Sequence, residues 1–469
     1  MRGKTVSELV LMVLLFSVFA FASNVRLTEA SSSTIYIRAD GSVNPVTAAI
    51  RRSGNLYVLT GNIRTTLDND GIVVERNNVM IDGAGYTIQG AVLFSVSKGV
   101  CLSKTNNVRI RNVRVDSFYY GVYVENCSGN EVVGNTITGN FEGIELYGSS
   151  NDLVSGNTLT KNGNGIVSYY SSGNVIAENS LVNNICSVLL AKSTNCTIAG
   201  NGLTASNRDG VCFVSSSGNT FADNNVTGSS GNGVYLDSSL NNSISRNIVT
   251  ANGESGIVLR DDSDSNGIFE NIVKANRGDG ILFSGIDRLN GPSGCNVSCN
   301  TITENGGNGV ELYGSSGNRL VGNNVARNLF CLGMNESSGN LVYHNNFVDN
   351  AHGVWAWKSV NVWNGSVEGN YWSEYFGHDL DWDGVGDSPC VVCENNADNH
   401  PLMNPYLRGD INHDAKVNIV DVNIVGKALG AQPGGKNWNP HADVDEDGKI
   451  SILDVAAVAG EFGKEWKNP

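Results

Sequence analysis

The chain has 469 residues, and its 46 acidic residues outnumber its 31 basic residues, which gives a formal net charge of −15. A surface this acidic repels polyanions, so nucleic acid is excluded as the expected partner. The sequence contains 56 glycines but only 8 prolines, a bias that favours many tight turns, and it is longer than one ordinary domain requires.

The N-terminus has the pattern of a secretory signal peptide. Arg2 and Lys4 precede an apolar run from Leu9 to Ala22 that ends in small residues. This run is about 14 residues long, whereas a membrane-spanning helix needs about 20. We therefore expect residues 1–22 to be cleaved. The mature chain, which has no further membrane span, should be secreted to the extracellular space or the cell surface. The alternative is an uncleaved N-terminal anchor.

A repeat of 22 residues dominates the middle of the chain. Consecutive units begin at residues 128, 150 and 172, and each contains three short apolar segments separated by Asn or Gly. In the first unit these segments are centred on Val132, Ile137 and Ile144. Segments this short predict strands rather than helices. One unit cannot bury its apolar side alone, so stacked units should form three parallel sheets around a shared core.

The 22-residue period sets the expected domain boundaries. The repeats cover residues 78–359. They are flanked by an N-terminal cap at 34–77 and a C-terminal cap at 360–407, because the open end of a sheet stack is liable to aggregate. Within the repeats, Asn135 and Asn157 occupy the same position and should hydrogen-bond along the stack. Residues 408–469 form a separate module of acidic loops and short helices.

Two acidic loops in this module have the spacing of calcium ligands. They span residues 410–421 and 443–454, and alternate residues of each loop converge on one point. Each loop opens into a short segment with an apolar stripe, which predicts a helix. The ligands expected through side chains, or through the backbone carbonyl at the two lysines, are Asp410, Asn412, Asp414, Lys416, Asn418 and Asp421 in the first loop, and Asp443, Asp445, Asp447, Lys449, Ser451 and Asp454 in the second.

This duplicated loop and helix resembles the dockerin family, in which paired half-EF-hands bind two calcium ions and dock onto a cohesin. The resemblance covers residues 408–469 and implies a cohesin-like protein domain as the partner. By the family pattern, the partner contact falls at Ile419, Val420, Ile452 and Leu453. The alternative is a calcium-stabilised cap without a partner.

The two loops differ at their sixth residue, which is Gly448 in the second loop and Ala415 in the first. A Cβ at this position strains the tight turn. The sequence therefore predicts that the first loop binds calcium more weakly than the second.

A third acidic loop lies in the C-terminal cap, at residues 379–387. Its acidic residues alternate, which favours a calcium ion that holds the end of the stack together, and a solvated turn is the alternative. The expected ligands are Asp379, Asp381, Asp383 and Asp387, with the backbone carbonyl of Val385.

The segments around this loop, GNYWSEYFGHDLDWDGVGDSP and ENNADNHPLMNPY, and the segment IYIRADGSVNP near the start are similar to secreted β-helix proteins of the NosD-type (CASH-domain) family. The resemblance spans residues 34–407. It implies an all-β fold, a right-handed parallel β-helix of about 22 residues per coil, to which the small α-helical dockerin-like calcium module is attached. The family name suggests copper. However, the six histidines are scattered with no pair at ligand spacing, whereas imidazole ligands should cluster, so calcium is the expected cofactor.

Polysaccharide enzymes share this fold, so catalysis has to be judged from individual residues. Asp237, Arg260 and Asp262 could form a lyase-like cluster, although a solvated charged face is the alternative. We expect a carbohydrate-binding or scaffold protein that is attached to a partner through its dockerin-like module. The alternative is a polysaccharide lyase or glycoside hydrolase. Aromatic residues that could stack on sugar rings, or simply pack on one another, are Tyr123, Tyr147, Tyr169, Tyr235, Tyr313, Trp355 and Trp357.

Overall fold

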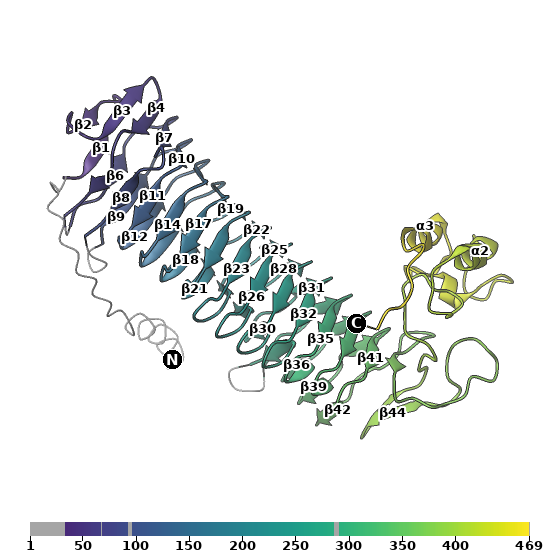
Figure 1. The fold of residues 1–469 in the computed structure, drawn as a ribbon. Coiled ribbons are helices and arrows are strands. Elements are labelled where there is room, and N and C mark those ends of the chain that lie inside the picture. The colour runs from purple at the N-terminus through teal and green to yellow at the C-terminus, as the bar shows by residue number, and fades with distance from the viewer. Residues whose placement is uncertain (1–32, 67, 92–95, 286–289, 469) are drawn as a thin grey trace. The chain divides into compact units, whose positions relative to one another are not determined.

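The computed structural model describes residues 33–66, 68–91, 96–285 and 290–468. The segment predicted to be a signal peptide lies outside these residues. Three long sheets of 15, 14 and 14 strands run side by side along a stack of coils (Figure 1). Within each sheet, neighbouring strands are three apart in the chain over most of the stack and pair in parallel. The prediction of three parallel sheets in a β-solenoid is confirmed.

The strands of these sheets are short, and most have three to six residues. Sheet 1 contains β1 (Ile35–Ile37), β2 (Val43–Asn44), β6 (Ile72–Val74), β9 (Lys98–Ser103), β12 (Tyr120–Glu125), β15 (Glu142–Tyr147), β18 (Asn164–Tyr169), β21 (Cys186–Ala191), β24 (Val211–Val214), β27 (Val234–Asp237), β30 (Ile257–Arg260), β33 (Ile281–Ser284), β36 (Asn308–Tyr313), β39 (Phe330–Asn335) and β42 (His352–Trp357). Sheet 2 contains β3 (Ile50–Ser53), β4 (Leu56–Leu59), β7 (Met80–Asp82), β10 (Arg109–Arg111), β13 (Glu131–Val133), β16 (Leu153–Ser155), β19 (Val175–Ala177), β22 (Thr197–Ala199), β25 (Thr220–Ala222), β28 (Ser243–Ser245), β31 (Gly267–Phe269), β34 (Asn296–Ser298), β37 (Arg319–Val321) and β40 (Leu341–Tyr343). Sheet 3 contains β5 (Ile63–Arg64), β8 (Thr87–Gln89), β11 (Arg114–Asp116), β14 (Thr136–Thr138), β17 (Thr158–Thr160), β20 (Ser180–Val182), β23 (Gly202–Thr204), β26 (Asn225–Thr227), β29 (Ile248–Thr250), β32 (Ile272–Lys274), β35 (Thr301–Thr303), β38 (Asn324–Ala326), β41 (Asn346–Val348) and β43 (Tyr371–Trp372).

The repeat builds this stack because each strand lies in register with the same strand of the next coil. Val122, Ile144 and Ile166 are partners across β12, β15 and β18, and all three are fully buried. Burying such a column removes apolar surface from water in every coil, at about 25 cal/mol per Å². The asparagine ladder is also present: Asn157 Oδ1 accepts hydrogen bonds from the backbone N–H and the side-chain amide of Asn135, at 2.9 and 3.0 Å.

The chain after the stack carries a two-stranded sheet and a small helical module. Strands β44 (Cys390–Cys393) and β45 (Asn396–Asp398) pair antiparallel. The helices α2 (Ile419–Ala428) and α3 (Ile452–Gly460), with the short 3₁₀ helix η1 (Pro440–Ala442), enclose a separate core of their own. The predicted pair of loop and helix repeats is confirmed.

The described residues belong to one compact unit, so contacts between the helical module and the stack are part of the fold. Among these residues, no helix is both long and apolar enough to cross a membrane.

Candidate functional site

The first acidic loop of the helical module is organised by its two end residues. Asp410 accepts backbone N–H groups from Asp414 at 3.1 Å and from Ala415 at 2.7 Å. Asp421 is fully buried and accepts the backbone N–H of Ile411 at 2.8 Å. Burial raises the pKa of Asp410 to about 6. The carboxylates therefore hold the loop closed around a point that a divalent cation can occupy.

The second loop repeats these contacts 33 residues later. Asp443 accepts from Asp447 at 3.2 Å and from Gly448 at 3.0 Å, and the buried Asp454 accepts from Val444 at 2.7 Å. One carboxylate oxygen from each of Asp443, Asp445 and Asp447 lies within 4.8 Å of the others, a spacing that could hold a metal ion. Burial is the largest cause that raises the pKa of Asp443, followed by the neighbouring carboxylates.

Some of the other predicted ligands in these loops also make hydrogen bonds within the module. The side chains of Asn418 and Ser451 cap α2 and α3, by accepting the backbone N–H groups of Val420 at 2.8 Å and Leu453 at 3.0 Å. In the first loop the amide of Asn412 donates to Asp414 at 3.0 Å. The predicted carbonyl ligands belong to Lys416 and Lys449, and both residues are exposed.

The two helices present equivalent apolar pairs to solvent at their first residues. Ile419 and Val420 are 59% and 45% exposed, and Ile452 and Leu453 are 68% and 62% exposed. These are the residues that the dockerin resemblance implies for partner contact, and together they form an exposed apolar surface on a module with a small core. We call these four residues the docking patch.

The third loop folds in the same way as the other two. Asp379 accepts backbone N–H groups from Asp383 at 3.2 Å and Gly384 at 2.9 Å, the residues four and five positions later, as Asp410 and Asp443 do. Carboxylate oxygens of Asp379, Asp381 and Asp383 lie within 4.8 Å of one another. The charge of Asp383 is the largest cause that raises the pKa of Asp381. Asp387 accepts the N–H of Leu380 at 2.7 Å, and Val385, whose carbonyl is the fifth predicted ligand, is buried.

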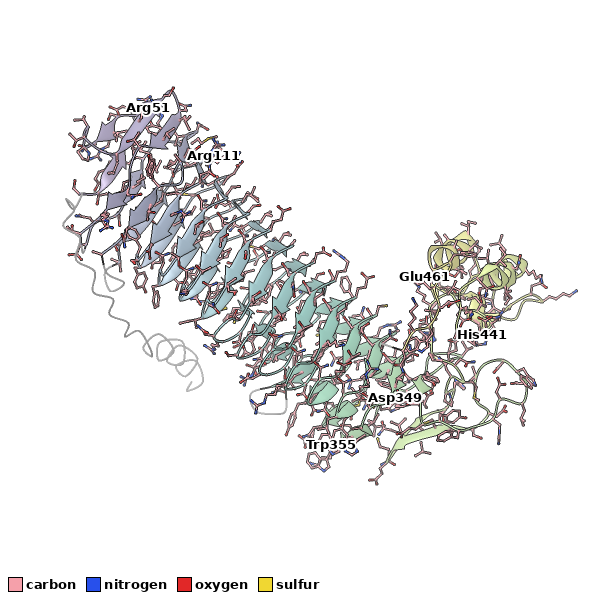
Figure 2. The ribbon with its side chains drawn as sticks, viewed as in Figure 1. Arg51, Arg111, Asp349, Trp355, His441 and Glu461 are labelled. Atoms are coloured by element: carbon pink, nitrogen blue, oxygen red, sulfur yellow. The ribbon has the colours of Figure 1, made fainter. Side chains whose placement is uncertain are left out.

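The outward face of sheet 1 carries the predicted aromatic residues in two parallel rows. The register aligns Tyr147 with Tyr169, Asp237 with Arg260, and Tyr313 with Asn335 and Trp357 in one row. The neighbouring row contains Tyr123, Glu145, Tyr235, Glu311 and Trp355. Trp355 and Trp357 on β42 are 42% and 48% exposed, and Trp355 is labelled in Figure 2.

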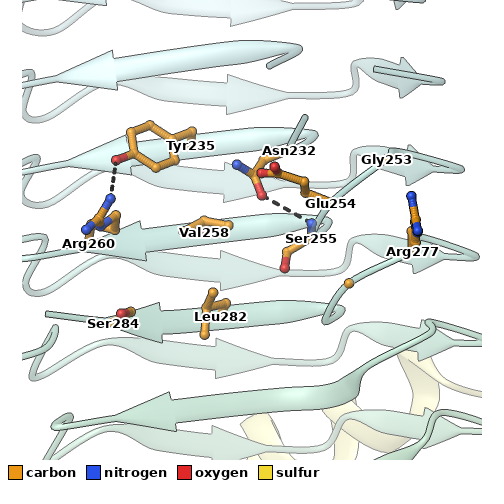
Figure 3. Close-up of a pocket in the computed structure, with 11 residues that line it drawn as sticks. Asn232, Tyr235, Gly253, Glu254, Ser255, Val258, Arg260, Arg277, Leu282 and Ser284 are labelled. Carbon is orange, nitrogen blue, oxygen red and sulfur yellow. Dashed lines mark hydrogen bonds between the residues drawn. The ribbon is translucent and has the colours of Figure 1, made fainter. Parts of the chain in front are cut away.

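A groove of about 450 Å³ crosses this face over β27, β30 and β33. Figure 3 shows Tyr235, Val258 and Leu282 on its floor, with Arg260 at one end and Arg277 at the other. The residues that line it are Asn232, Tyr235, Gly253, Glu254, Ser255, Val258, Arg260, Arg277, Gly278, Leu282 and Ser284.

The weak catalytic candidates are only partly brought together at this groove. Arg260 lines it and donates to the hydroxyl of Tyr235 at 3.4 Å. Asp237 is the register partner of Arg260 on the adjacent strand. Asp262 lies in the exposed turn after β30 and is not part of the lining.

Sheet 1 also carries a pair of buried acidic residues that the sequence did not predict as a site. Glu142 and Glu145 on β15 are only 8% and 9% exposed. Burial, followed by the charge of Glu145, raises the pKa of Glu142 well above its usual value, and burial raises the pKa of Glu145 to about 7. The Oε2 atom of Glu142 is buried without a hydrogen-bond partner. The tyrosines of β12 cover the pair, and we call Glu142, Glu145, Tyr120 and Tyr123 the acidic patch.

The sequence signal for this patch was a carboxylate in a strand position that neighbouring coils fill with Tyr, Asn, Val or Leu. Tyr123, Glu145, Val167 and Leu189 are successive partners in one row. The structure shows in addition that the two glutamates of this strand lie close enough for the charge of Glu145 to raise the pKa of Glu142.

Most of the chain matches known protein families. Residues 28–206, 182–289 and 284–377 match the family described as periplasmic copper-binding protein (NosD). This chain belongs to the NosD family. Residues 408–462 match the dockerin type I domain, so this NosD protein carries a dockerin type I domain at its C-terminal end. No curated protein matches the chain closely enough to count as a relative.

Solved structures resemble this NosD protein in fold alone. A mutant of the periplasmic alginate epimerase AlgG is 13% identical, with 71% of this chain and 84% of the other covered and a TM-score of 0.42. The DFA-IIIase from Arthrobacter chlorophenolicus A6 in complex with DFA-III is 14% identical, with coverages of 55% and 71% and a TM-score of 0.39. The Dettilon tailspike protein is 19% identical, with coverages of 61% and 62% and a TM-score of 0.36.

The structure corrects one expectation about this NosD protein. Its histidines are scattered in sequence, but three of the six, His344, His413 and His441, meet around the buried carboxylate of Glu368. They come from a corner of the stack, from the first acidic loop and from η1. Spacing within the sequence could not reveal a cluster whose members lie up to 97 residues apart.

Proposed function

We propose that this protein is a secreted surface component that binds polysaccharide along sheet 1 and attaches to a cohesin-like domain through its dockerin. Calcium holds the dockerin loops in this proposal, and residues 1–22 direct secretion. The observation that carries it is the docking patch. Two loops with the same carboxylate contacts each place two exposed apolar residues at the start of a helix.

Calcium is the cation that suits these loops. Each offers several carboxylate or amide oxygens and a backbone carbonyl within one turn, which is the ligand set that a hard divalent cation prefers. Without a cation, the clustered carboxylates repel one another, so binding should also stabilise the module. The third loop has the same design and should bind calcium at the end of the stack.

The partner surface should be apolar and depend on calcium indirectly. Calcium fixes the loops, the loops orient the first turns of α2 and α3, and these turns expose the docking patch. A few well-packed residues at the centre of an interface commonly carry most of the binding energy. Replacing Ile419 and Ile452 together with Asp should abolish capture of a cohesin domain on a calcium-containing column. Replacing the exposed Leu429 with Asp, outside the patch, should leave capture intact.

The groove on sheet 1 favours an acidic polysaccharide. Its apolar and aromatic floor can pack on sugar rings, and Arg260 and Arg277 can pair with sugar carboxylates at either end. A panel of polyuronates and neutral glycans, scored at once for binding and for chain cleavage, tests this reading. Retention by polyuronates without shortening of the chains supports a binding protein. Retention by no glycan in the panel would refute it.

A second candidate function is cleavage of a polysaccharide, and the acidic patch favours it. Two buried carboxyl groups with raised pKa values on one strand are the kind of pair that glycoside hydrolysis uses, one group as acid and the other as base or nucleophile. If the same panel releases shortened chains, Glu145→Gln should abolish release while binding in the groove persists. Asp237→Ala and Arg260→Ala test the lyase alternative in the same assay.

A further inference from the structure

The carboxylate of Glu368 lies at the junction of the stack with the dockerin domain, where it meets three imidazole rings. Its Oε1 atom is shared by His413 Nε2, at 3.1 Å, and by His441 Nδ1. Its Oε2 atom contacts His344 Nε2 at 2.8 Å. The Glu368 side chain is only 7% exposed, and the three imidazoles are 8 to 15% exposed. This cluster is therefore largely withdrawn from water.

The hydrogen bond made by the second ring nitrogen of His413, Nδ1, determines which nitrogen carries the proton of the neutral ring. His413 Nδ1 lies 3.0 Å from the backbone carbonyl oxygen of Asp383. A carbonyl can only accept a hydrogen bond, so Nδ1 must carry the proton. In the neutral ring, Nε2 is then a bare lone pair directed at a carboxylate oxygen, and two acceptors face each other. A cation has to lie between them, either a proton on Nε2 or a metal ion.

The surroundings of this pair match those of a metal centre. One atom from each of Glu368, His413 and His441 lies within 4.8 Å of the others. The rings of His413 and His441 are nearly perpendicular, at 87°, so they approach the shared oxygen from different directions. Around a tetrahedral zinc ion with bonds of about 2.0 to 2.1 Å, ligand atoms lie about 3.3 Å apart. The distance of 3.1 Å from His413 Nε2 to the shared oxygen needs little change to reach this value, whereas His441 Nδ1 lies closer to that oxygen and would move away from it.

The contacts that surround the three proposed ligand residues also resemble those of a metal site. A ligating histidine almost always donates its other N–H to a carbonyl or carboxylate, as His413 does to Asp383. His344 holds the second oxygen of Glu368, and its ring stacks on Tyr406 with centroids 4.0 Å apart. His344 is thus a positioning residue that orients the carboxylate towards the other two ligands.

We propose that Glu368, His413 and His441 form a binding site for a divalent transition-metal ion of the zinc and copper class. Two imidazoles and one carboxylate suit these ions and not calcium, which prefers oxygen ligands alone. The copper named in the NosD family description is compatible with this ligand set. The site joins the stack, through Glu368, to the dockerin, through His413 and His441. A bound ion would fix the orientation of the docking patch relative to the stack.

The test uses the full mature chain with calcium in excess, so that the acidic loops are occupied. Cobalt is titrated as a spectroscopic probe, and zinc is then added to displace it. We expect one equivalent of cobalt with the visible absorption of a four-coordinate nitrogen and oxygen site, lost stoichiometrically on addition of zinc. His441→Gln should weaken zinc binding by more than about tenfold. The matched control is His352→Gln, because His352 is exposed on β42 and lies outside the cluster.

The role of His344 is tested by a separate measurement, the absorption spectrum of bound cobalt. His344→Gln should keep one equivalent of cobalt but change the intensity and position of the absorption bands, because the carboxylate is no longer oriented. Calcium uptake by each variant shows that the dockerin is still folded. A wild-type chain that takes up no saturable equivalent of cobalt or zinc would overturn the proposal, and so would equal losses in His441→Gln and His352→Gln. In either case Glu368 serves only as a hydrogen-bonded ionic link. The result is independent of whether the docking patch binds a cohesin.

Discussion

At the scale of single residues, each acidic loop is held in shape by the carboxylate that is also its first expected calcium ligand. Asp410, Asp443 and Asp379 each accept backbone N–H groups from the residues four and five positions later, so each loop is held in shape. Their spacing made these residues predictable, because loop ligands are local in sequence. The loops differ most at the sixth residue. Ala415 has a φ of +64° and Gly448 a φ of +81°.

Ala415→Gly should therefore strengthen calcium binding by the first loop, and Gly448→Ala should weaken it in the second. A left-handed conformation costs a residue with a Cβ about 1 kcal/mol, which corresponds to about fivefold in affinity. A Cβ at Gly448 would meet no atom within 4 Å, so the effect there is one of backbone conformation alone. Calorimetric titration of the two variants with calcium measures these two opposite changes in affinity. Changes of the same sign in both variants would contradict the prediction.

Glu145 should make the stability of the stack depend on pH. Burial raises its pKa in the folded chain from 4.5 to about 7, so the folded state binds the proton more tightly than the unfolded state. Stability should therefore fall as the pH rises from about 4.5 to about 7, by about 3 kcal/mol at most. Glu145→Gln should raise the melting temperature at pH 8 and leave it unchanged at pH 4. Glu254→Gln, at an exposed position, should change neither. A buried carboxyl group whose ionisation destabilises the fold at neutral pH is a candidate for a functional role.

At the scale of elements, the stack and the dockerin are stabilised by different means. The stack buries a continuous column of apolar residues and satisfies its corners with asparagine ladders. Its eight cysteines form no cross-links, since all ten cysteines of the chain lie in the described part and are free. The dockerin has a core of seven buried residues, and its helices of ten and nine residues are too short to persist alone.

Removal of calcium should consequently melt α2 and α3 and leave the stack intact. Chelation with EGTA should abolish the helical part of the far-ultraviolet circular dichroism, while the β-sheet signal and its melting temperature remain. The double variant Asp443→Ala, Asp454→Ala should reproduce this loss more fully than Asp410→Ala, Asp421→Ala, because we expect the first loop, with Ala415 at positive φ, to be the weaker site already. Helices that survive EGTA would show that the small core is sufficient.

The elements also show what the sequence could and could not predict. The three sheets were predictable because a period of 22 residues fixes the register of every strand, as in the row Val122, Ile144 and Ile166. The cluster around Glu368 was not, because it forms only where the chain after the stack folds back. His413 and Glu446 occupy the same fourth position of the two loops, both with positive φ, and both contact the stack, at Glu368 and Tyr343. No local pattern shows which position of a loop faces a distant neighbour.

At the scale of the whole molecule, the protein is acidic overall, but the groove on sheet 1 is lined by two arginines. The formal charge of −15 disfavours acidic ligands in general, so binding of a polyuronate has to rely on local pairing. Arg260 and Arg277 are separated by the apolar floor of the groove (Figure 3). Arg260 ends β30 and Arg277 precedes the neighbouring strand β33, so a ligand that engages both must run along the strands over the length of this floor, which favours a polymer over a single sugar.

Arg260→Gln and Arg277→Gln should each weaken polyuronate binding by about tenfold, because each removes a charge-assisted hydrogen bond. Binding by the wild type should fall as salt is raised, and the double variant should lose most of this salt dependence, since screening acts on charge pairs. Arg246→Gln is the matched control. Arg246 pairs with Asp223 at 2.8 Å outside the groove, so its loss changes the net charge equally without changing the groove. Affinity electrophoresis at two salt concentrations measures the wild type and the four variants. Equal weakening by Arg246→Gln would mean that overall charge, and not the groove, controls binding.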